Sequence, residues 1–66
     1  MNHPEPGQRF THKKRGSIYT VIGIGYLQTR HDFLDDEEVV IYQEPSGILW
    51  VRPLTEFCDG RFEAVP

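Results

Sequence analysis

The sequence predicts a small all-β domain, because stretches rich in β-branched and aromatic residues alternate with glycine, proline and aspartate turns. Its 66 residues make one domain, and a hydrophobic fraction of 38% is enough for one compact core. Five short strands in so short a chain must curl to bury an apolar face. We therefore expect a five-stranded SH3-like barrel or a strongly curled antiparallel sheet, with one short 3₁₀ or helical turn.

The clearest strand signal is residues 17–27, where alternation divides the side chains between two faces. Gly23 and Gly25 interrupt this strand, and paired glycines there indicate a bulge or a bend. One face is expected to carry Ile18, Ile22, Ile24 and Tyr26, and the other Tyr19, Val21 and Leu27.

The remaining elements follow from turn residues. Pro45-Ser46-Gly47 should join strands at 38–43 and 48–52 into a hairpin, and Pro53 should end the second. Residues 28–37 are predicted to form a long acidic loop. Residues 1–6, with two prolines and no periodicity, are expected to be a flexible lead to the domain at 7–66. The other expected elements are strands at 8–12 and 61–65, a turn with positive φ at Gly16, and a helical turn at 54–57.

Charge and cysteine content indicate a cytoplasmic protein. The net charge is −3, so the chain as a whole lacks the basic character of many nucleic-acid-binding proteins. The single cysteine, Cys58, cannot form an internal disulfide, which favours a reducing compartment. Residues 1–6 do not resemble a signal peptide, and no apolar run has the length of a membrane span.

A spaced pattern of residues covers most of the chain. It runs Phe10-x-His12-x-Lys14-x-Gly16-x-x-Tyr19-x-Val21-x-Gly23, then Val39-Val40-x-Tyr42, then Leu49-Trp50-Val51-Arg52-Pro53-Leu54-x-x-Phe57. This pattern resembles the DUF1653 family of small bacterial and phage proteins of unknown function. The Trp-Val-Arg-Pro-Leu part is its most specific portion, and the acidic connection over residues 29–37 is longer here than in the family. The resemblance implies a small barrel and no particular activity.

Three groups of side chains are candidate binding residues, each with a structural alternative. Trp50 and Arg52 alternate onto one face, where they could hold a base, a carboxylate or a proline; alternatively Trp50 is core and Arg52 pairs with an acid such as Glu38 or Glu56. The tyrosines could line a peptide groove or pack in the core. The basic run could meet phosphates or be a solvated turn. The candidates are His12, Lys13, Lys14, Arg15, Tyr19, Tyr42, Trp50 and Arg52.

No set of residues predicts catalysis, a metal or a cofactor. The three histidines are scattered and the single cysteine matches no zinc pattern, while Gly23-Ile24-Gly25 lies within a strand rather than in a phosphate loop. We therefore expect a non-enzymatic binding or adaptor module, monomeric or homodimeric, with a protein partner and no membrane association. The resemblance to the DUF1653 family further implies a phage or accessory-element protein that acts on a host factor. The alternative is a nucleic-acid or nucleotide binder that uses the basic turn with Trp50 and Arg52.

Overall fold

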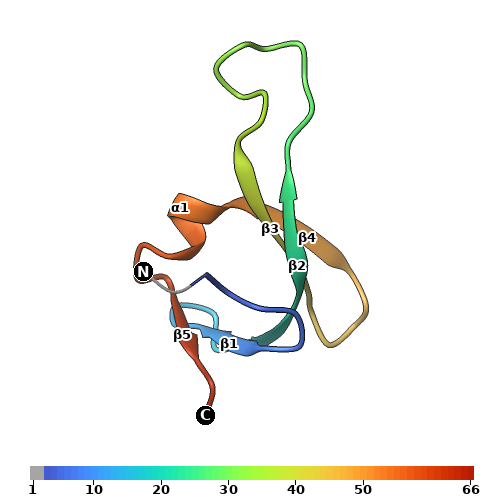
Figure 1. The fold of residues 1–66 in the computed structure, drawn as a ribbon. Helices are drawn as coiled ribbons and strands as arrows, with labels where there is room; N and C mark the ends of the chain where they lie inside the picture. The colour runs from blue at the N-terminus through green and yellow to red at the C-terminus, as the bar shows by residue number, and fades with distance from the viewer. Residues whose placement is uncertain (1–2) are drawn as a thin grey trace.

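The computed structural model describes residues 3–66 as one five-stranded antiparallel sheet with one short helix (Figure 1). Across the sheet the strand order is β4-β3-β2-β1-β5. The predicted all-β class and its curled-sheet form are confirmed. Over the described residues the sheet does not close into a barrel, since β4 and β5 are its two edges. The elements are β1 (Arg9–His12), β2 (Ile18–Tyr26), β3 (Glu38–Gln43), β4 (Leu49–Pro53), α1 (Leu54–Phe57) and β5 (Phe62–Ala64).

Strand β2 contains the predicted irregularity. Its register against β3 shifts between Val21 and Gly23, so that Ile22 is an extra residue. Ile22 is 46% exposed, whereas Ile24 packs against the core. The prediction that put Ile22 and Ile24 on the same face is therefore wrong, because a bulge reverses the alternation beyond it. The bulge also bends the strand, which lets so small a sheet curl around its own core.

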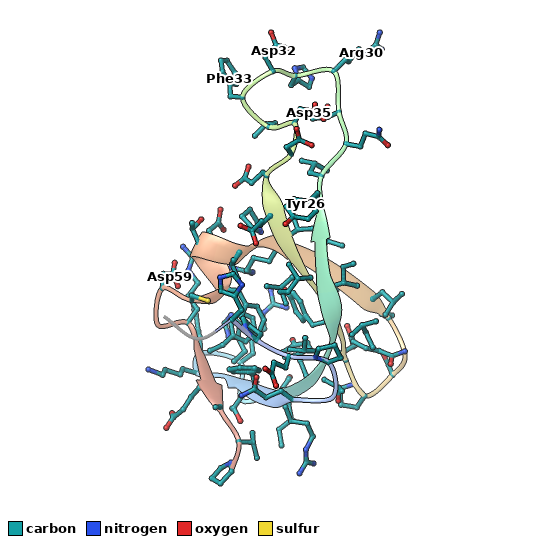
Figure 2. The ribbon with its side chains drawn as sticks, in the orientation of Figure 1. Tyr26, Arg30, Asp32, Phe33, Asp35 and Asp59 are labelled. Atoms are coloured by element: carbon teal, nitrogen blue, oxygen red, sulfur yellow. The ribbon has the colours of Figure 1, made fainter. Side chains whose placement is uncertain are left out.

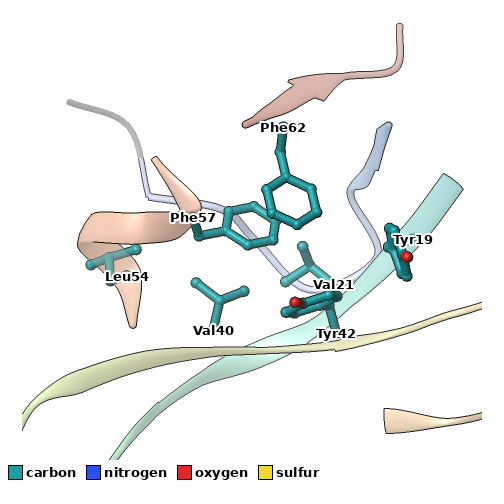
Figure 3. Close-up of a cluster of buried hydrophobic side chains, with 7 residues drawn as sticks. All are labelled: Tyr19, Val21, Val40, Tyr42, Leu54, Phe57 and Phe62. Carbon is teal, nitrogen blue, oxygen red and sulfur yellow. The ribbon is translucent and has the colours of Figure 1, made fainter. Parts of the chain in front are cut away.

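Aromatic rings form most of the core (Figure 3). The ring of Phe57 stacks on that of Phe62, with centroids 4.2 Å apart. The rings of Phe10 and Tyr42 approach the Phe57 ring at steep angles, with centroids 5.0 and 5.4 Å from its own. Each such pair adds about 0.5–1.5 kcal/mol to the burial of its apolar area. The buried cluster consists of Tyr19, Val21, Val40, Tyr42, Leu54, Phe57 and Phe62.

Helix α1 brings two of these core residues onto the sheet. It starts directly after Pro53, the last residue of β4, as predicted for a residue that cannot continue the ladder. Leu54 and Phe57, three positions apart on one helical face, are both buried. The N–H of Cys58 donates to the carbonyl of Leu54 at 3.0 Å and closes the turn. No helix within residues 3–66 has the length and apolarity needed to cross a membrane.

The predicted hairpin and acidic loop connect the central strands. In the β3–β4 turn the N–H of Glu44 donates to the carbonyl of Ile48 at 3.0 Å, and Gly47 has φ 99°.

The longer β2–β3 loop, residues 27–37, protrudes from the end of the sheet away from β1 and β5 (Figure 2). Its tip residue Phe33 is 92% exposed. Asp36 has φ 65°, a left-handed conformation that aspartate tolerates.

The predicted lead over residues 1–6 lies partly outside the described residues, which begin at 3. In its described part, Pro4 is buried. A turn follows in which the N–H of Gln8 donates to the carbonyl of Glu5 at 3.0 Å. Gly7 then donates to the carbonyl of Val21 at 2.8 Å. These bonds connect the segment before β1 to β2.

Candidate functional site

A hollow of about 640 Å³ lies between the β1–β2 turn, strand β4 and the segment before β5. We call it the basic groove. Its volume falls within the range of about 300–1,000 Å³ that is usual for ligand pockets. Five of the chain's seven lysine and arginine residues line it, although the net charge of the chain is −3. The lining residues are His12, Lys13, Lys14, Arg15, Arg52 and Arg61.

Four of these side chains come from His12, the last residue of β1, and from the β1–β2 turn that follows it, whose backbone is closed by hydrogen bonds. The N–H of His12 donates to the carbonyl of Ser17 at 2.9 Å, and that of Gly16 to the carbonyl of His12 at 2.7 Å. The N–H of Arg15 donates to Nδ1 of His12 at 3.2 Å. Gly16 has the predicted positive φ, at 75°. The turn therefore holds Lys13, Lys14 and Arg15 on a defined backbone.

Pairing of β5 with β1 brings Arg61 to the same place. His12 pairs with Phe62, and the N–H of Lys13 donates to the carbonyl of Arg61 at 3.0 Å. The Arg61 guanidinium forms ion pairs with Asp59, Nε to Oδ2 at 3.0 Å, and with Glu56 at 3.5 Å. Residues from the two ends of the chain thus form one wall of the basic groove.

Arg52 closes the groove from the β4 side, and its side chain is 25% exposed. Its Nε donates to the hydroxyl of Tyr42 at 3.4 Å, and its guanidinium carbon lies 5.6 Å from the ring centroid of Phe62. One of its terminal nitrogens lies 3.8 Å from a carboxylate oxygen of Glu56, so the alternative in which Arg52 pairs with Glu56 is confirmed. These contacts fix the guanidinium beside the core.

The groove's cations are only partly neutralised. Arg52 and Arg61 share the carboxylate of Glu56, which is 49% exposed. Lys13, Lys14 and Arg15 form no ion pair with any residue in the described range 3–66. Three positively charged side chains on one short turn therefore lack an ion-pair partner within residues 3–66. An anion entering the groove would supply one.

Aromatic side chains form a second, smaller hollow that adjoins the groove and shares His12, Arg15 and Arg52 with it. Its volume is about 60 Å³, far smaller than that of the basic groove. Tyr19 and Tyr42 are only 6% and 5% exposed, because they belong to the core. Its aromatic residues are Tyr19, Tyr42, Trp50 and Phe62.

Trp50 is the exception among these aromatics, because it is 43% exposed and is not part of the core. The alternative interpretation, in which Trp50 is a core residue, is therefore wrong. Its indole N–H donates to the Glu44 carboxylate at 2.6 Å. This hydrogen bond, with a second from the hydroxyl of Ser46 at 2.8 Å, lowers the pKa of Glu44, and Arg15 adds a smaller charge effect. The bond holds the exposed indole in one orientation.

The eight binding residues predicted from the sequence all line these two adjoining hollows. The tyrosines reach them only through a small exposed fraction. Arg61 and Phe62 were missed, because β5 follows a turn and only its pairing with β1 places it here. Cys58 is a free, half-buried thiol. Among residues 3–66 no three His, Cys, Asp or Glu side chains gather closely enough to hold a metal ion.

Comparison with known proteins identifies the family. The model of a family described as "Protein of unknown function (DUF1653)" matches residues 8–63 of the 66. No curated protein and no solved structure gives a match to the chain. The matched range includes all five strands except the last residue of β5, together with every residue of the basic groove. The chain belongs to the DUF1653 family.

Proposed function

We propose that this domain is a non-enzymatic binding module whose basic groove takes the phosphodiester backbone of a nucleic acid. The observation that carries the proposal is the gathering of five of seven lysines and arginines around one groove of an acidic chain. Charge of one sign that collects in a hollow focuses the local field and attracts the opposite charge. Phosphate groups are the usual partners of mixed lysine and arginine surfaces of this kind.

The arrangement suits phosphates in two ways. Lys13, Lys14 and Arg15 carry charges without carboxylate partners among the described residues, so their binding to an anion requires no ion pair to break. Arg52 is held by its bond to Tyr42 and Arg61 by its ion pair with Asp59, and both can present a forked guanidinium that donates hydrogen bonds to phosphate oxygens. The adjoining aromatic hollow is far smaller than the groove, at about 60 Å³, which favours contacts to the backbone over recognition of sequence.

Fluorescence anisotropy with a labelled single-stranded oligonucleotide, and with its duplex, would test the proposal across a salt series. The logarithm of the affinity should fall linearly with the logarithm of the salt concentration. Each phosphate contact contributes a slope of about −0.7 for single strands and −0.9 for duplex DNA. Affinity for either form that does not change with salt would contradict the proposal.

Arg15→Ala and Arg30→Ala form a matched pair of variants for this assay. Both remove one arginine and one positive charge, but Arg15 lines the groove and Arg30 lies in the protruding β2–β3 loop (Figure 2). Arg15→Ala should reduce the salt slope by about 0.7–0.9 and weaken binding, whereas Arg30→Ala should leave the slope unchanged. Equal effects of the two variants would show that net charge, and not the groove, drives binding.

A protein partner is the second candidate function, and the exposed apolar side chains of β4 favour it. Leu49 and Val51 are 57% and 59% exposed, on a strand with no neighbour on its outer side within the described sheet. Affinity capture from a bacterial lysate, with and without nuclease, would distinguish the candidates. Bound material lost with nuclease supports the first, and a single protein retained after nuclease supports the second. In either case we expect the domain to act in the reducing cytoplasm of a bacterial or phage-infected cell.

A further inference from the structure

The two edges of the sheet differ in how they are protected. Edge strands expose unpaired backbone groups, and proteins commonly blunt them with short length or charged side chains. Strand β5 is both short and charged, since it spans three residues and exposes Glu63. Strand β4 has five residues, and the apolar run Ile48–Val51 leads into it and forms its first half. These side chains are 54%, 57%, 43% and 59% exposed in chain order.

Hydrogen-bond alternation shows which backbone groups β4 presents outward. Residues of an antiparallel pair alternate between facing the neighbouring strand and facing away from it. The N–H of Glu44 donates to the carbonyl of Ile48 at 3.0 Å, so Ile48 faces β3, as do Trp50 and Arg52 by alternation. Leu49 and Val51 therefore turn their N–H and C=O groups toward the open edge. Pro53 has no N–H to offer beyond them.

We propose that β4 pairs with β4 of a second copy of this chain, antiparallel about a two-fold axis at Trp50. In this register Leu49 of each copy faces Val51 of the other, and the two residues exchange two hydrogen bonds in each of the two pairs. Trp50 then lies opposite Trp50 of the second copy in a non-hydrogen-bonded pair, with Cα atoms about 4.5 Å apart. Such cross-strand aromatic pairs stabilise antiparallel strands. The proposal does not depend on what the basic groove binds.

Side-chain chemistry favours a second copy over an unrelated strand, because the edge is self-complementary. Leu49 and Val51 lie on the sheet face opposite Trp50, so the axis brings apolar side chain against apolar side chain. Ile41, beside Val51 in the register of β3 with β4, continues this face within each copy. The only charged residue of β4 is Arg52, which falls opposite Ile48 of the second copy, so like charges do not meet.

Light scattering coupled to gel filtration would test the proposal with the full chain. A dimer of twice 7.7 kDa, or 15.4 kDa, is expected. Val51→Pro removes one outward N–H and keeps the β3–β4 bonds, so it should give a folded monomer. Ile22→Lys is the control, since Ile22 is exposed on β2 away from the edge. It should leave the dimer intact if edge pairing forms the interface.

A spectroscopic signature adds a second readout. Each chain has one tryptophan, so exciton coupling between tryptophans in the far-ultraviolet circular dichroism spectrum requires two copies. The coupled signal should be present in the wild type and absent in Val51→Pro. If Val51→Pro fails to fold, Trp50→Cys in a Cys58→Ser background should form a disulfide-linked dimer, because the expected Cα separation suits a disulfide. Ile22→Cys in that background should not form such a dimer.

Three results would overturn the proposal. The first is a monomer at the highest concentration that can be reached. The second is a dimer that survives Val51→Pro but is lost in Ile22→Lys, which would show that the sheet faces pack together instead of the edges. The third is crosslinking at position 22 as efficient as that at position 50.

Discussion

Replacing Phe57 by alanine should unfold most of the protein at 25 °C. The Phe57 side chain is 2% exposed and contacts three other aromatic rings at centroid distances of 4.2, 5.0 and 5.4 Å. Truncating a buried phenylalanine to alanine costs about 3–5 kcal/mol. A core of this size supplies a free energy of unfolding of about 3–5 kcal/mol, so the variant loses as much as the wild type has. Circular dichroism during urea and thermal denaturation would measure the loss.

Phe33→Ala is the matched control for this prediction. It makes the same substitution at a side chain that is 92% exposed at the tip of the β2–β3 loop, and the midpoint of unfolding should not move (Figure 2). Phe57→Leu, which keeps much of the apolar volume, should fold with a free energy of unfolding lower by about 1–3 kcal/mol. Each kcal/mol lowers the melting temperature by about 4–8 °C in a domain of this size. A folded Phe57→Ala with the wild-type midpoint would refute the central place given to this ring.

Four further variants test the groove, the indole and two glycine positions. Glu56→Gln removes the carboxylate that two groove arginines share, and should tighten oligonucleotide binding by up to about fivefold in anisotropy, since exposed ion pairs contribute up to about 1 kcal/mol. The pKa of Glu44 is lowered, so its bond to Trp50 stabilises the fold above the unfolded pKa and is lost as pH falls through the folded one. The Trp50 fluorescence should thus change below pH 4.5, and Glu44→Gln should abolish that step. Gly47→Ala should lower the free energy of unfolding by about 1–3 kcal/mol in urea titrations because φ is 99° there, whereas Gly23→Ala, with no atom within 4 Å of an added Cβ, should change it by less than about 0.5 kcal/mol.

Local features of the sequence predicted most of the fold. The β-branched and aromatic residues of Val39–Tyr42 are typical of a strand, and a single proline marks where β4 gives way to α1. Turn residues also predicted the turns, since Gly16 and Gly47 both take the positive φ that their positions between strands require. These signals depend on neighbours in the chain, which is why they can be interpreted without the structure.

Features that depend on distant parts of the chain were not predicted. Glycine spacing indicated the bulge in β2, but not that Ile22 would be the extra residue and Ile24 would return to the core. Arg61 joined the basic groove only through the pairing of β5 with β1. For Trp50 the sequence left a binding role and a core role open, because pattern alone does not distinguish an edge strand such as β4 from a central one.

The basic groove and the acidic β2–β3 loop lie apart, so the net charge alone does not predict how the protein meets a charged partner. The molecule measures 36 Å along its longest axis, whereas electrostatic interactions at physiological salt decay over about 8 Å. An approaching polyanion therefore senses only the end that it meets. At low salt, where screening is weak, the positive groove and the negative loop together form an electric dipole. This dipole turns the groove toward a negative surface and the loop away from it before contact. The formal charge of −3 is a sum that combines a positive groove with a negative loop.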